Sequence, residues 1–295
     1  MKLHQRLFLF VLCSVAFACT NPEHKTQKNS KAKVNIVSNN VRIDYTDTGS
    51  GDTTLLFVHG WCINKTYWAD QIAHFSKRYR VVAIDLPGFG KSGRNRNVWT
   101  TAAFGEDIKN VITQLDLKNV VLIGHSMAGD IILQGAVNIP GRVIALVGVD
   151  NFKSAGVPFT GDSVKAKKEY TDAIAAMKRN FKATTFGYFN QALFYKTTTK
   201  AVKDRVLNDV AHADPVIATA CMEQQDDYPE AAKLLQVKKK LYLINSDYTP
   251  TDTSGLVAKK IPYRLLEIHA TGHFPMIEKP QEFNTLLDKA MADIK

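Results

Sequence analysis

The chain has 295 residues, of which 45% are hydrophobic, so it is long enough and apolar enough to form a large domain with its own core. Its 38 Lys and Arg outnumber its 28 Asp and Glu, which gives a formal net charge of +10. The basic residues are scattered and are not interleaved with aromatic residues in a recognition pattern, so we expect no nucleic-acid partner.

The first 18 residues are typical of an export signal. Two basic residues precede the apolar stretch LFLFVLCSVAFA, which is too short to span a bilayer, because a spanning helix needs about 20 residues. The end of this stretch together with Cys19, AFAC, resembles part of the bacterial lipobox, which predicts cleavage before Cys19 and acylation of its thiol. An ordinary secretory signal cleaved after Ala18 is the alternative.

Residues 19–33 are polar and lack apolar periodicity, which predicts a flexible tether. With the signal, this tether predicts an exported, membrane-anchored bacterial lipoprotein that faces the periplasm or the cell surface. We expect no membrane contact other than this lipid anchor.

From about residue 34 the chain alternates short apolar runs with longer amphipathic stretches. The run VRIDYTDTG is expected to form an edge strand, and the other expected strands are 54–60, 79–88, 119–126, 143–150, 240–247 and 263–273. The expected helices are 66–77, 100–115, 127–139, 254–260 and 280–293. Runs that are apolar on both faces are typical of parallel strands covered by helices, so the pattern predicts an α/β fold with a mostly parallel sheet.

One interval, 151–237, contains no run of this strand-like type. It is too long for an ordinary connection and carries helix-like segments separated by Gly, Pro and Thr. We therefore expect a helical insertion at 151–237 that divides the core into residues 34–150 and 238–295.

The segment GHSMAG places Ser126 between an expected buried strand and an expected helix. A nucleophile elbow requires this context, because its tight turn exposes the serine hydroxyl and leaves little room for flanking side chains. Gly124 and Ala128 supply the small flanking residues, although Ala128 stands where a glycine is usual. The alternative is a serine that only caps the following helix.

The remaining members of a catalytic triad are sought at the ends of later strands. His273 follows the last expected strand, in the segment HATGHFPMIEKP, and is the expected base. Asp247 ends the strand before it and is the favoured acid, because it stops that strand directly upstream of the histidine strand. Asp150 ends an earlier strand and is the rival acid.

An oxyanion hole needs backbone N–H groups that point at the developing negative charge. We expect one from Met127, which follows the serine, and another from Trp61, which follows the HG of HGWCINK.

These segments, in their order along the chain, resemble the α/β-hydrolase family: HGW, DLPGFGKS, GHSMAG, VGVD, a helical insertion, INSD and GHFPMIEKP. The resemblance implies that Ser126 is the nucleophile, that His273 is the base, and that the insertion is a helical cap over the active site. Two departures are Ala128 in place of glycine and a short INSDYTPTD turn without the glycine that normally precedes the acid.

The segment GFGKSG fits a dinucleotide-binding pattern, but a polar loop follows it where such a site needs a helix. No Cys, His and Asp cluster has metal-ligand spacing, so neither a cofactor nor a metal is expected. Cys62 and Cys221 are the cysteines left in the expected domain, and their number implies no disulfide framework.

Taken together, the residues predict a serine hydrolase that cleaves an ester or a related acyl compound through an acyl-enzyme. A carbon–carbon bond hydrolase and a cofactor-free haloperoxidase of the same fold are alternatives. A hypothesis of another class is a non-catalytic surface protein that binds a ligand on a hydrolase scaffold. In each case the expected partner is a small molecule.

Overall fold

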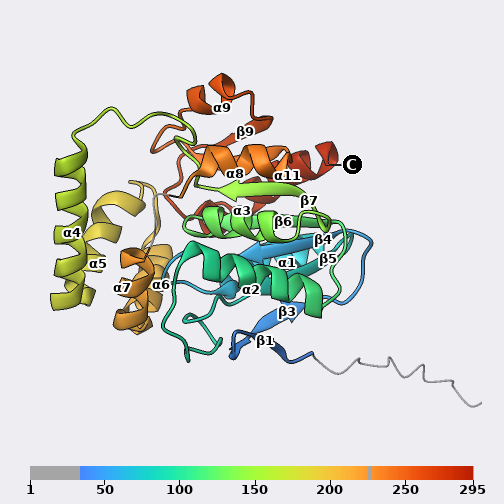
Figure 1. Ribbon diagram of the computed structural model, residues 1–295, viewed down its shortest axis with the longest axis horizontal. Helices are drawn as coiled ribbons and strands as arrows, with labels where there is room; N and C mark the ends of the chain where they lie inside the picture. Colours follow the sequence, from blue (N-terminus) through green and yellow to red (C-terminus); the bar gives the residue numbers. More distant parts are fainter. Residues whose placement is uncertain (1–33, 225–227, 295) are drawn as a thin grey trace, which may run out of the picture. The chain divides into compact units, whose positions relative to one another are not determined.

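Seven strands form a mixed sheet in the order β3-β5-β4-β6-β7-β8-β9 (Figure 1). All neighbouring pairs are parallel except β3 and β5, which run antiparallel at one edge. Their bounds are Tyr45–Asp47 for β3, Thr54–Val58 for β4, Arg80–Ile84 for β5, Val120–His125 for β6, Val143–Val149 for β7, Leu241–Ser246 for β8 and Tyr263–Ile268 for β9. The computed structural model describes residues 34–224 and 228–294, so the expected signal, the tether and Cys19 lie outside the described residues.

The central strands are buried along their whole length, as the apolar runs predict. Every residue of β4 and of β6 is buried. Helices α2 (Thr101–Gln114), α3 (Ala128–Asn138) and α8 (Glu230–Val237) pack side by side on one face of the sheet, and α1 (Ala69–Phe75) and α11 (Pro280–Asp293) pack together on the other (Figure 1). The predicted α/β fold with a mostly parallel sheet is confirmed.

The expected edge strand VRIDYTDTG is divided in the structure. Its first part is β2 (Val41–Ile43), which pairs with β1 (Ile36–Ser38) in a separate antiparallel ribbon, and its second part is β3. The division falls at Asp44, whose backbone N–H donates to the Ser92 hydroxyl at 2.8 Å and whose carbonyl accepts the Asp85 N–H at 2.8 Å. These bonds go to a loop and to the residue after β5, so the chain changes sheets there.

Between β7 and β8 the chain forms a group of helices at the end of the sheet to which the β7 arrow points (Figure 1). They are α4 (Ser163–Arg179), α5 (Phe181–Tyr188), the π-helical turn η2 (Phe189–Leu193), α6 (Lys200–His212) and α7 (Pro215–Glu223). These helices contact one another, whereas α8 contacts α3 through a face that buries Ala231 and Leu234. The interval 151–237 therefore holds two parts: the helices α4 to α7, which we call the cap, and α8, which packs on the core.

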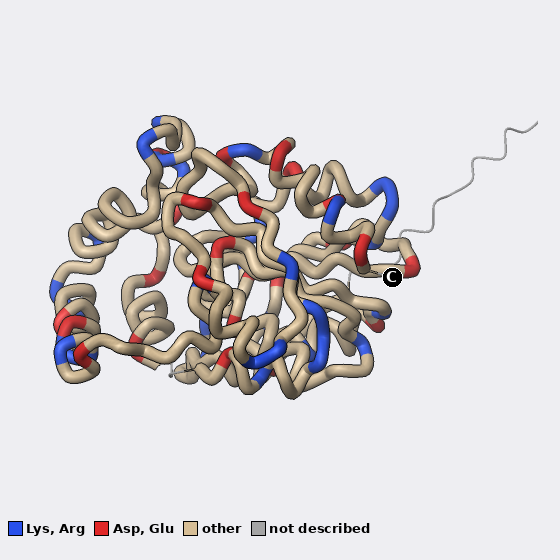
Figure 2. The backbone as a smooth tube through the Cα atoms, turned by 90° about the horizontal axis from the view of Figure 1, so that it is seen from above, with Lys and Arg blue, Asp and Glu red and all other residues tan. Residues whose placement is uncertain are grey.

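The remaining helices are short: the 3₁₀ turn η1 (Lys65–Trp68), α9 (Ser254–Ala258) and α10 (Pro275–Glu278). Across the described part of the chain, we find no helix that has both the length and the apolar character needed to cross a bilayer. Basic and acidic residues lie interspersed over the core and the cap in the view of Figure 2. Cys62 and Cys221 are both buried and unpaired.

Candidate active site

Ser126 lies at the turn between β6 and α3, at the carboxyl end of the sheet. Its φ of +54° is in the left-handed region, which L-residues seldom occupy. Two backbone bonds hold this turn: the Ser126 N–H donates to the Val149 carbonyl at 3.0 Å, and the Ser126 carbonyl accepts the Gly129 N–H at 2.8 Å. Such strained positions concentrate at functional sites, and this geometry is that of a nucleophile elbow.

The residues that flank the serine must be small for a steric reason. A Cβ on Gly124 would lie 2.5 Å from the carbonyl oxygen of Ala128, so no larger residue fits position 124 without moving the helix. Ala128 itself is fully buried and its methyl group is accommodated in the core. The alanine in place of glycine therefore leaves the elbow intact.

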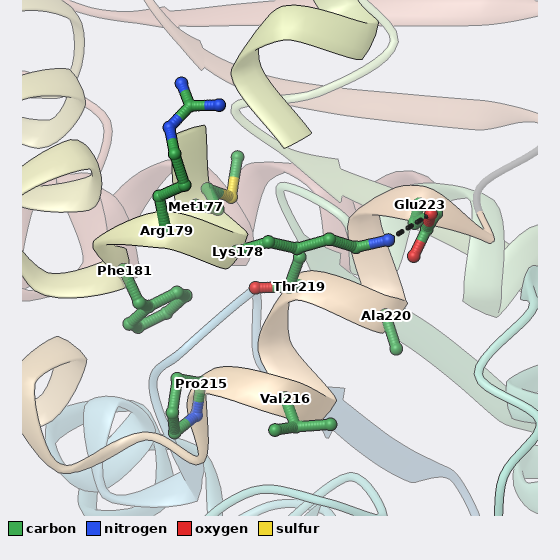
Figure 3. A pocket seen from close by; sticks show the side chains of 9 residues that line it. All are labelled: Met177, Lys178, Arg179, Phe181, Pro215, Val216, Thr219, Ala220 and Glu223. Carbon is green, nitrogen blue, oxygen red and sulfur yellow. Dashed lines mark hydrogen bonds and ion pairs between the residues drawn. The ribbon is translucent and has the colours of Figure 1, made fainter. Parts of the chain in front are cut away.

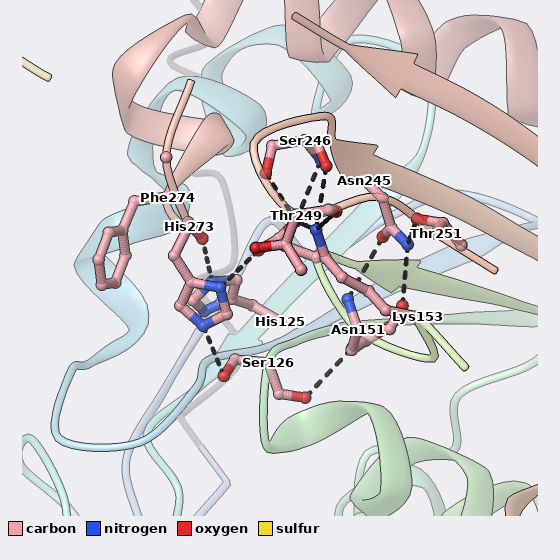
Figure 4. Close-up of polar contacts among 12 residues, drawn as sticks. His125, Ser126, Asn151, Lys153, Asn245, Ser246, Thr249, Thr251, His273 and Phe274 are labelled. Carbon is pink, nitrogen blue, oxygen red and sulfur yellow. Dashed lines mark hydrogen bonds and ion pairs between the residues drawn. The ribbon is translucent and has the colours of Figure 1, made fainter. Parts of the chain in front are cut away.

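His273 joins Ser126 to a carboxylate (Figure 4). Its Nε2 lies 2.7 Å from Ser126 Oγ, and its Nδ1 lies 2.5 Å from Asp150 Oδ2. With the proton on Nδ1 donated to Asp150, Nε2 is free to accept the serine hydroxyl proton. This is the arrangement of a Ser-His-Asp triad.

Asp247, the acid favoured from the sequence, does not contact His273, and that prediction is wrong. Its Oδ2 lies 2.8 Å from Nδ1 of His269, and its Oδ1 accepts the Ala270 N–H at 3.3 Å. The Asp247 side chain is 40% exposed, whereas that of Asp150 is fully buried. The hydrogen bond from His269 lowers the pKa of Asp247, and this pair lies on the surface.

Strand geometry explains why the acid comes from β7. The nucleophile strand β6 pairs directly with β7, with Gly124 opposite Gly148, so Asp150 emerges one strand away from Ser126. Side chains alternate between the two faces of a strand. At the end of β8 it is the Ser246 side chain that points to Asp150, and Asp247, one residue later, points away.

Asp150 is held by four polar contacts. Its Oδ1 accepts the Ser246 N–H at 3.0 Å and the Ser246 hydroxyl at 2.9 Å, and it lies 2.8 Å from Nζ of Lys153. Its Oδ2 faces His273. Burial by itself would raise the pKa of Asp150, but the hydrogen bond and charge of His273 and the ammonium of Lys153 lower that pKa well below its usual range. The carboxylate therefore stays ionised at neutral pH.

The loop that carries His273 is fixed by contacts with the cap and with α10. The His273 N–H donates to the Leu193 carbonyl of the cap at 2.8 Å. The Glu278 carboxylate accepts the N–H groups of Gly272 at 3.0 Å and of Phe274 at 3.2 Å. These bonds restrict where the imidazole can lie.

His125, the last residue of β6, also contacts the loop that carries His273. Its Nε2 lies 2.7 Å from the His273 carbonyl, and its ring centroid lies 4.7 Å from that of His273. Burial, together with the neighbouring His273, lowers the pKa of His125 to about 3, so its ring is neutral near pH 7. A neutral ring with its proton on Nε2 donates to the carbonyl, which leaves the buried Nδ1 without a hydrogen-bond partner among the described residues.

Trp61 and Met127, whose backbone N–H groups are the predicted oxyanion donors, both line the cavity that Ser126 faces. Within the described part of the chain, neither N–H donates a hydrogen bond to a protein acceptor. Gly60 brings the Trp61 loop against the elbow, since a Cβ there would lie 3.0 Å from the Ser126 Cβ. His59 braces this loop: its Nδ1–H donates to the Gly60 carbonyl at 2.7 Å, and its Nε2 accepts the Leu86 N–H at 3.0 Å.

The segment GFGKSG forms a loop between β5 and α2. It wraps around Asp85, whose carboxylate accepts the Lys91 N–H at 2.9 Å and the Lys65 N–H at 2.8 Å. The Lys65 ammonium completes the cluster at 2.7 Å from Asp85. A Cβ on Gly90 would lie 2.3 Å from the Asp85 carboxyl carbon, and its φ of +52° also favours glycine. The glycines therefore allow this loop to close on a buried carboxylate.

A cavity of about 140 Å³ lies over the serine, between the core and the cap. The core supplies Trp61, His125, Ser126, Met127, His273 and Phe274 to its lining, and the cap supplies Tyr188, Phe189, Leu193 and Met222. The walls are mostly aromatic or aliphatic, and their polar groups belong to the side chains of Ser126, His273, His125 and Tyr188. No group of three or more His, Cys, Asp or Glu that could hold a metal ion occurs in residues 34–224 and 228–294.

Several supporting residues were not predicted from the sequence. Asn151 donates from Nδ2 to the carbonyls of Gly124 at 2.8 Å and Ser126 at 3.2 Å, and so ties the elbow to the end of β7. Lys153, Ser246 and Glu278 hold the acid and the histidine loop. The signal for two of them is the segment VGVDNFK, in which polar residues cluster directly after a buried strand.

Comparison with known proteins identifies the fold family. Residues 53–280 match the family described as alpha/beta hydrolase fold. A pimeloyl-[acyl-carrier protein] methyl ester esterase from Edwardsiella ictaluri is 25% identical over 80% of this chain and 92% of its own length. A dihydrolipoyllysine-residue acetyltransferase component of an acetoin cleaving system from Cupriavidus necator is 23% identical over 84% of this chain. The chain spans just under two thirds of that relative, 66% of its length.

Among solved structures, an esterase from Thermogutta terrifontis superimposes with a TM-score of 0.74 at 21% identity. The superposition covers 86% of this chain and 94% of the esterase. At this level of identity the likeness concerns the fold.

The two candidate acids predict opposite outcomes when each is changed to asparagine. Asp150→Asn removes the charge that holds the His273 tautomer, and we expect hydrolysis to fall about 10⁴-fold, as for the corresponding change in another triad. Asp247→Asn removes a surface ion pair and should change the rate by about twofold or less. Steady-state kinetics of both variants, with circular dichroism as a folding control, measure this. A large loss in Asp247→Asn with activity kept in Asp150→Asn would contradict the assignment.

Proposed function

The chain belongs to the alpha/beta hydrolase fold family, and we propose that it is a serine hydrolase that cleaves carboxylic esters with a short apolar acyl group. The observation that carries the proposal is the continuous contact from Ser126 through His273 to Asp150, at 2.7 Å and 2.5 Å. The methyl ester esterase among the relatives supports an ester as the substrate class.

In the proposed reaction His273 accepts the proton of Ser126 as Oγ attacks the ester carbonyl. Asp150 stabilises the imidazolium that forms. The N–H groups of Trp61 and Met127 are the proposed donors to the oxyanion, where each such donor contributes roughly 10²–10³-fold in rate. His273 then gives its proton to the leaving alcohol, and a water molecule that it activates hydrolyses the acyl-enzyme.

The size of the cavity over Ser126 supports a short acyl group. A volume of about 140 Å³ is a few times the roughly 30 Å³ that one water molecule occupies in the liquid, so it accommodates an acyl chain of only a few carbon atoms. Its aromatic and aliphatic lining favours an apolar chain.

A second hollow, of about 570 Å³, lies in the cap between α4, α5 and α7 (Figure 3). It is separated from the cavity over Ser126 by α7 and by a pair of aromatic rings. On α7, Met222 lines the cavity over the serine, whereas Thr219 and Ala220 line the hollow. Phe181 lines the hollow and meets Trp61, of the serine cavity, edge to face at 5.9 Å between ring centroids. We propose that this partition limits the length of the acyl group.

A fluorophosphonate probe tests the proposed nucleophile, because the serine oxygen attacks phosphorus and displaces fluoride only when a base activates it. We expect covalent labelling of the folded protein and loss of labelling in Ser126→Ala and His273→Ala. Mass spectrometry of peptides locates the adduct. A folded protein that is not labelled between pH 6 and 9 would favour the alternative of a non-catalytic binding protein.

Removing the Phe181 ring should lengthen the acyl chains that are accepted. We expect the wild type to prefer p-nitrophenyl esters of the shortest acids. Phe181→Ala should raise kcat/KM for esters of longer acids about 10-fold relative to the acetate ester, because each buried methylene contributes about 0.8 kcal/mol. Phe159→Ala is the matched control, because Phe159 lies in the segment between β7 and α4, is 69% exposed and lines neither space. An unchanged chain-length profile in Phe181→Ala would refute the partition.

A further inference from the structure

Lys153 lies behind the acid of the triad and contacts neither Ser126 nor the cavity over it. We infer that Lys153 is a positioning residue whose positive charge extends the activity of the triad to lower pH; this inference rests on the proposed function. Lys153 does so by holding Asp150 in place and by opposing the protonation of His273.

The ammonium of Lys153 is surrounded by three oxygen atoms (Figure 4). Nζ lies 2.8 Å from Asp150 Oδ1 and donates to the carbonyls of Ser246 at 3.0 Å and Thr249 at 2.7 Å. An ammonium has three N–H donors, so each can be satisfied. The Lys153 side chain is 18% exposed, and the ring centroid of Tyr248 lies 5.0 Å from Nζ.

These contacts place a fixed cation on the oxygen of Asp150 that does not face His273. The two carboxylate oxygens are thereby divided: Oδ2 accepts from His273, and Oδ1 accepts from Lys153 and Ser246. A carboxylate that already neutralises one cation stabilises a second one less. The imidazolium of His273 is therefore less favoured than it would be beside Asp150 alone.

The other titratable groups around this pair do not replace Lys153. His125 of β6 has its pKa lowered to about 3, so it is neutral in the working range. Burial raises the pKa of the Tyr248 phenol after β8 and of the Tyr188 phenol in α5, so both are neutral as well. The Glu278 carboxylate of α10 accepts hydrogen bonds from the N–H groups of Gly272 and Phe274 and from the Thr198 hydroxyl. Among the lysine and arginine side chains of the described residues, Lys153 is the one that forms an ion pair with Asp150.

The same contacts could act only as a mechanical tie between the end of β7 and the loop after β8. A tie of that kind would affect the maximal rate and the stability. It would leave the pH at which His273 becomes protonated where it is. The pH dependence therefore separates a role of the charge from a role of the shape.

The test compares wild type, Lys153→Met and Lys153→Arg in the dependence of kcat/KM on pH. Methionine removes the charge and keeps much of the side-chain volume, and arginine keeps the charge. We expect the acidic limb to move to higher pH by about one unit in Lys153→Met. At a given acid pH, kcat/KM of this variant divided by its plateau value should then be about tenfold lower than the same ratio in the wild type. Lys153→Arg should keep the acidic limb of the wild type. A lower plateau in Lys153→Met with an unmoved acidic limb would overturn the inference.

A second measurement does not depend on turnover. Nuclear magnetic resonance of the resting protein follows the titration of the His273 ring, assigned by its absence in His273→Gln. The midpoint should move upward by about one pH unit in Lys153→Met, or in Lys153→Gln if the methionine variant does not fold. An unmoved or lowered midpoint would refute the role of Lys153. If the wild type does not hydrolyse esters but the midpoint still shifts in Lys153→Met, the proposed function alone would be refuted.

Discussion

The position of one imidazole determines what this molecule can do. His273 touches Ser126 on one side and Asp150 on the other, and these residues come from three separate strand ends of the parallel sheet. Each partner is held independently of the ring: the serine by the elbow turn, and the acid by Ser246 and Lys153. Hydrogen bonds weaken steeply with distance and angle. The Ser126–His273–Asp150 contacts therefore form only when these supports place all three side chains correctly.

The supports also explain features of the fold that catalysis does not use directly. Cap carbonyls contact both sides of the site: that of Leu193 accepts the His273 N–H, and that of Ala218 accepts the Trp61 indole N–H at 2.9 Å. The cap therefore positions both the base loop and the proposed oxyanion loop while it encloses the cavity. A movement of the cap would disturb both loops together, so we regard the cap as part of the active site's framework.

Much of this arrangement could be predicted from the sequence, and the failures have physical causes. Buried parallel strands are apolar on both faces, so β4, β6 and β8 were evident, and the strand-to-helix context of Ser126 identified the elbow. The acid was misassigned because Asp150 and Asp247 both end strands, and one residue of register decides which side chain faces inward. The contacts of Ser246 with Asp150 and of Glu278 with the cap Thr198 join residues 96 and 80 positions apart, and no local pattern indicates them.

The hydrogen bond between His273 Nδ1 and Asp150 tests the account most directly. Proton resonance spectra of the resting protein show such a buried imidazole N–H as a signal far downfield of the amide region. We expect this signal in the wild type and in Asp247→Asn, and its loss in Asp150→Asn. A signal that survives in Asp150→Asn and disappears in Asp247→Asn would show that Asp150 is not the partner of His273.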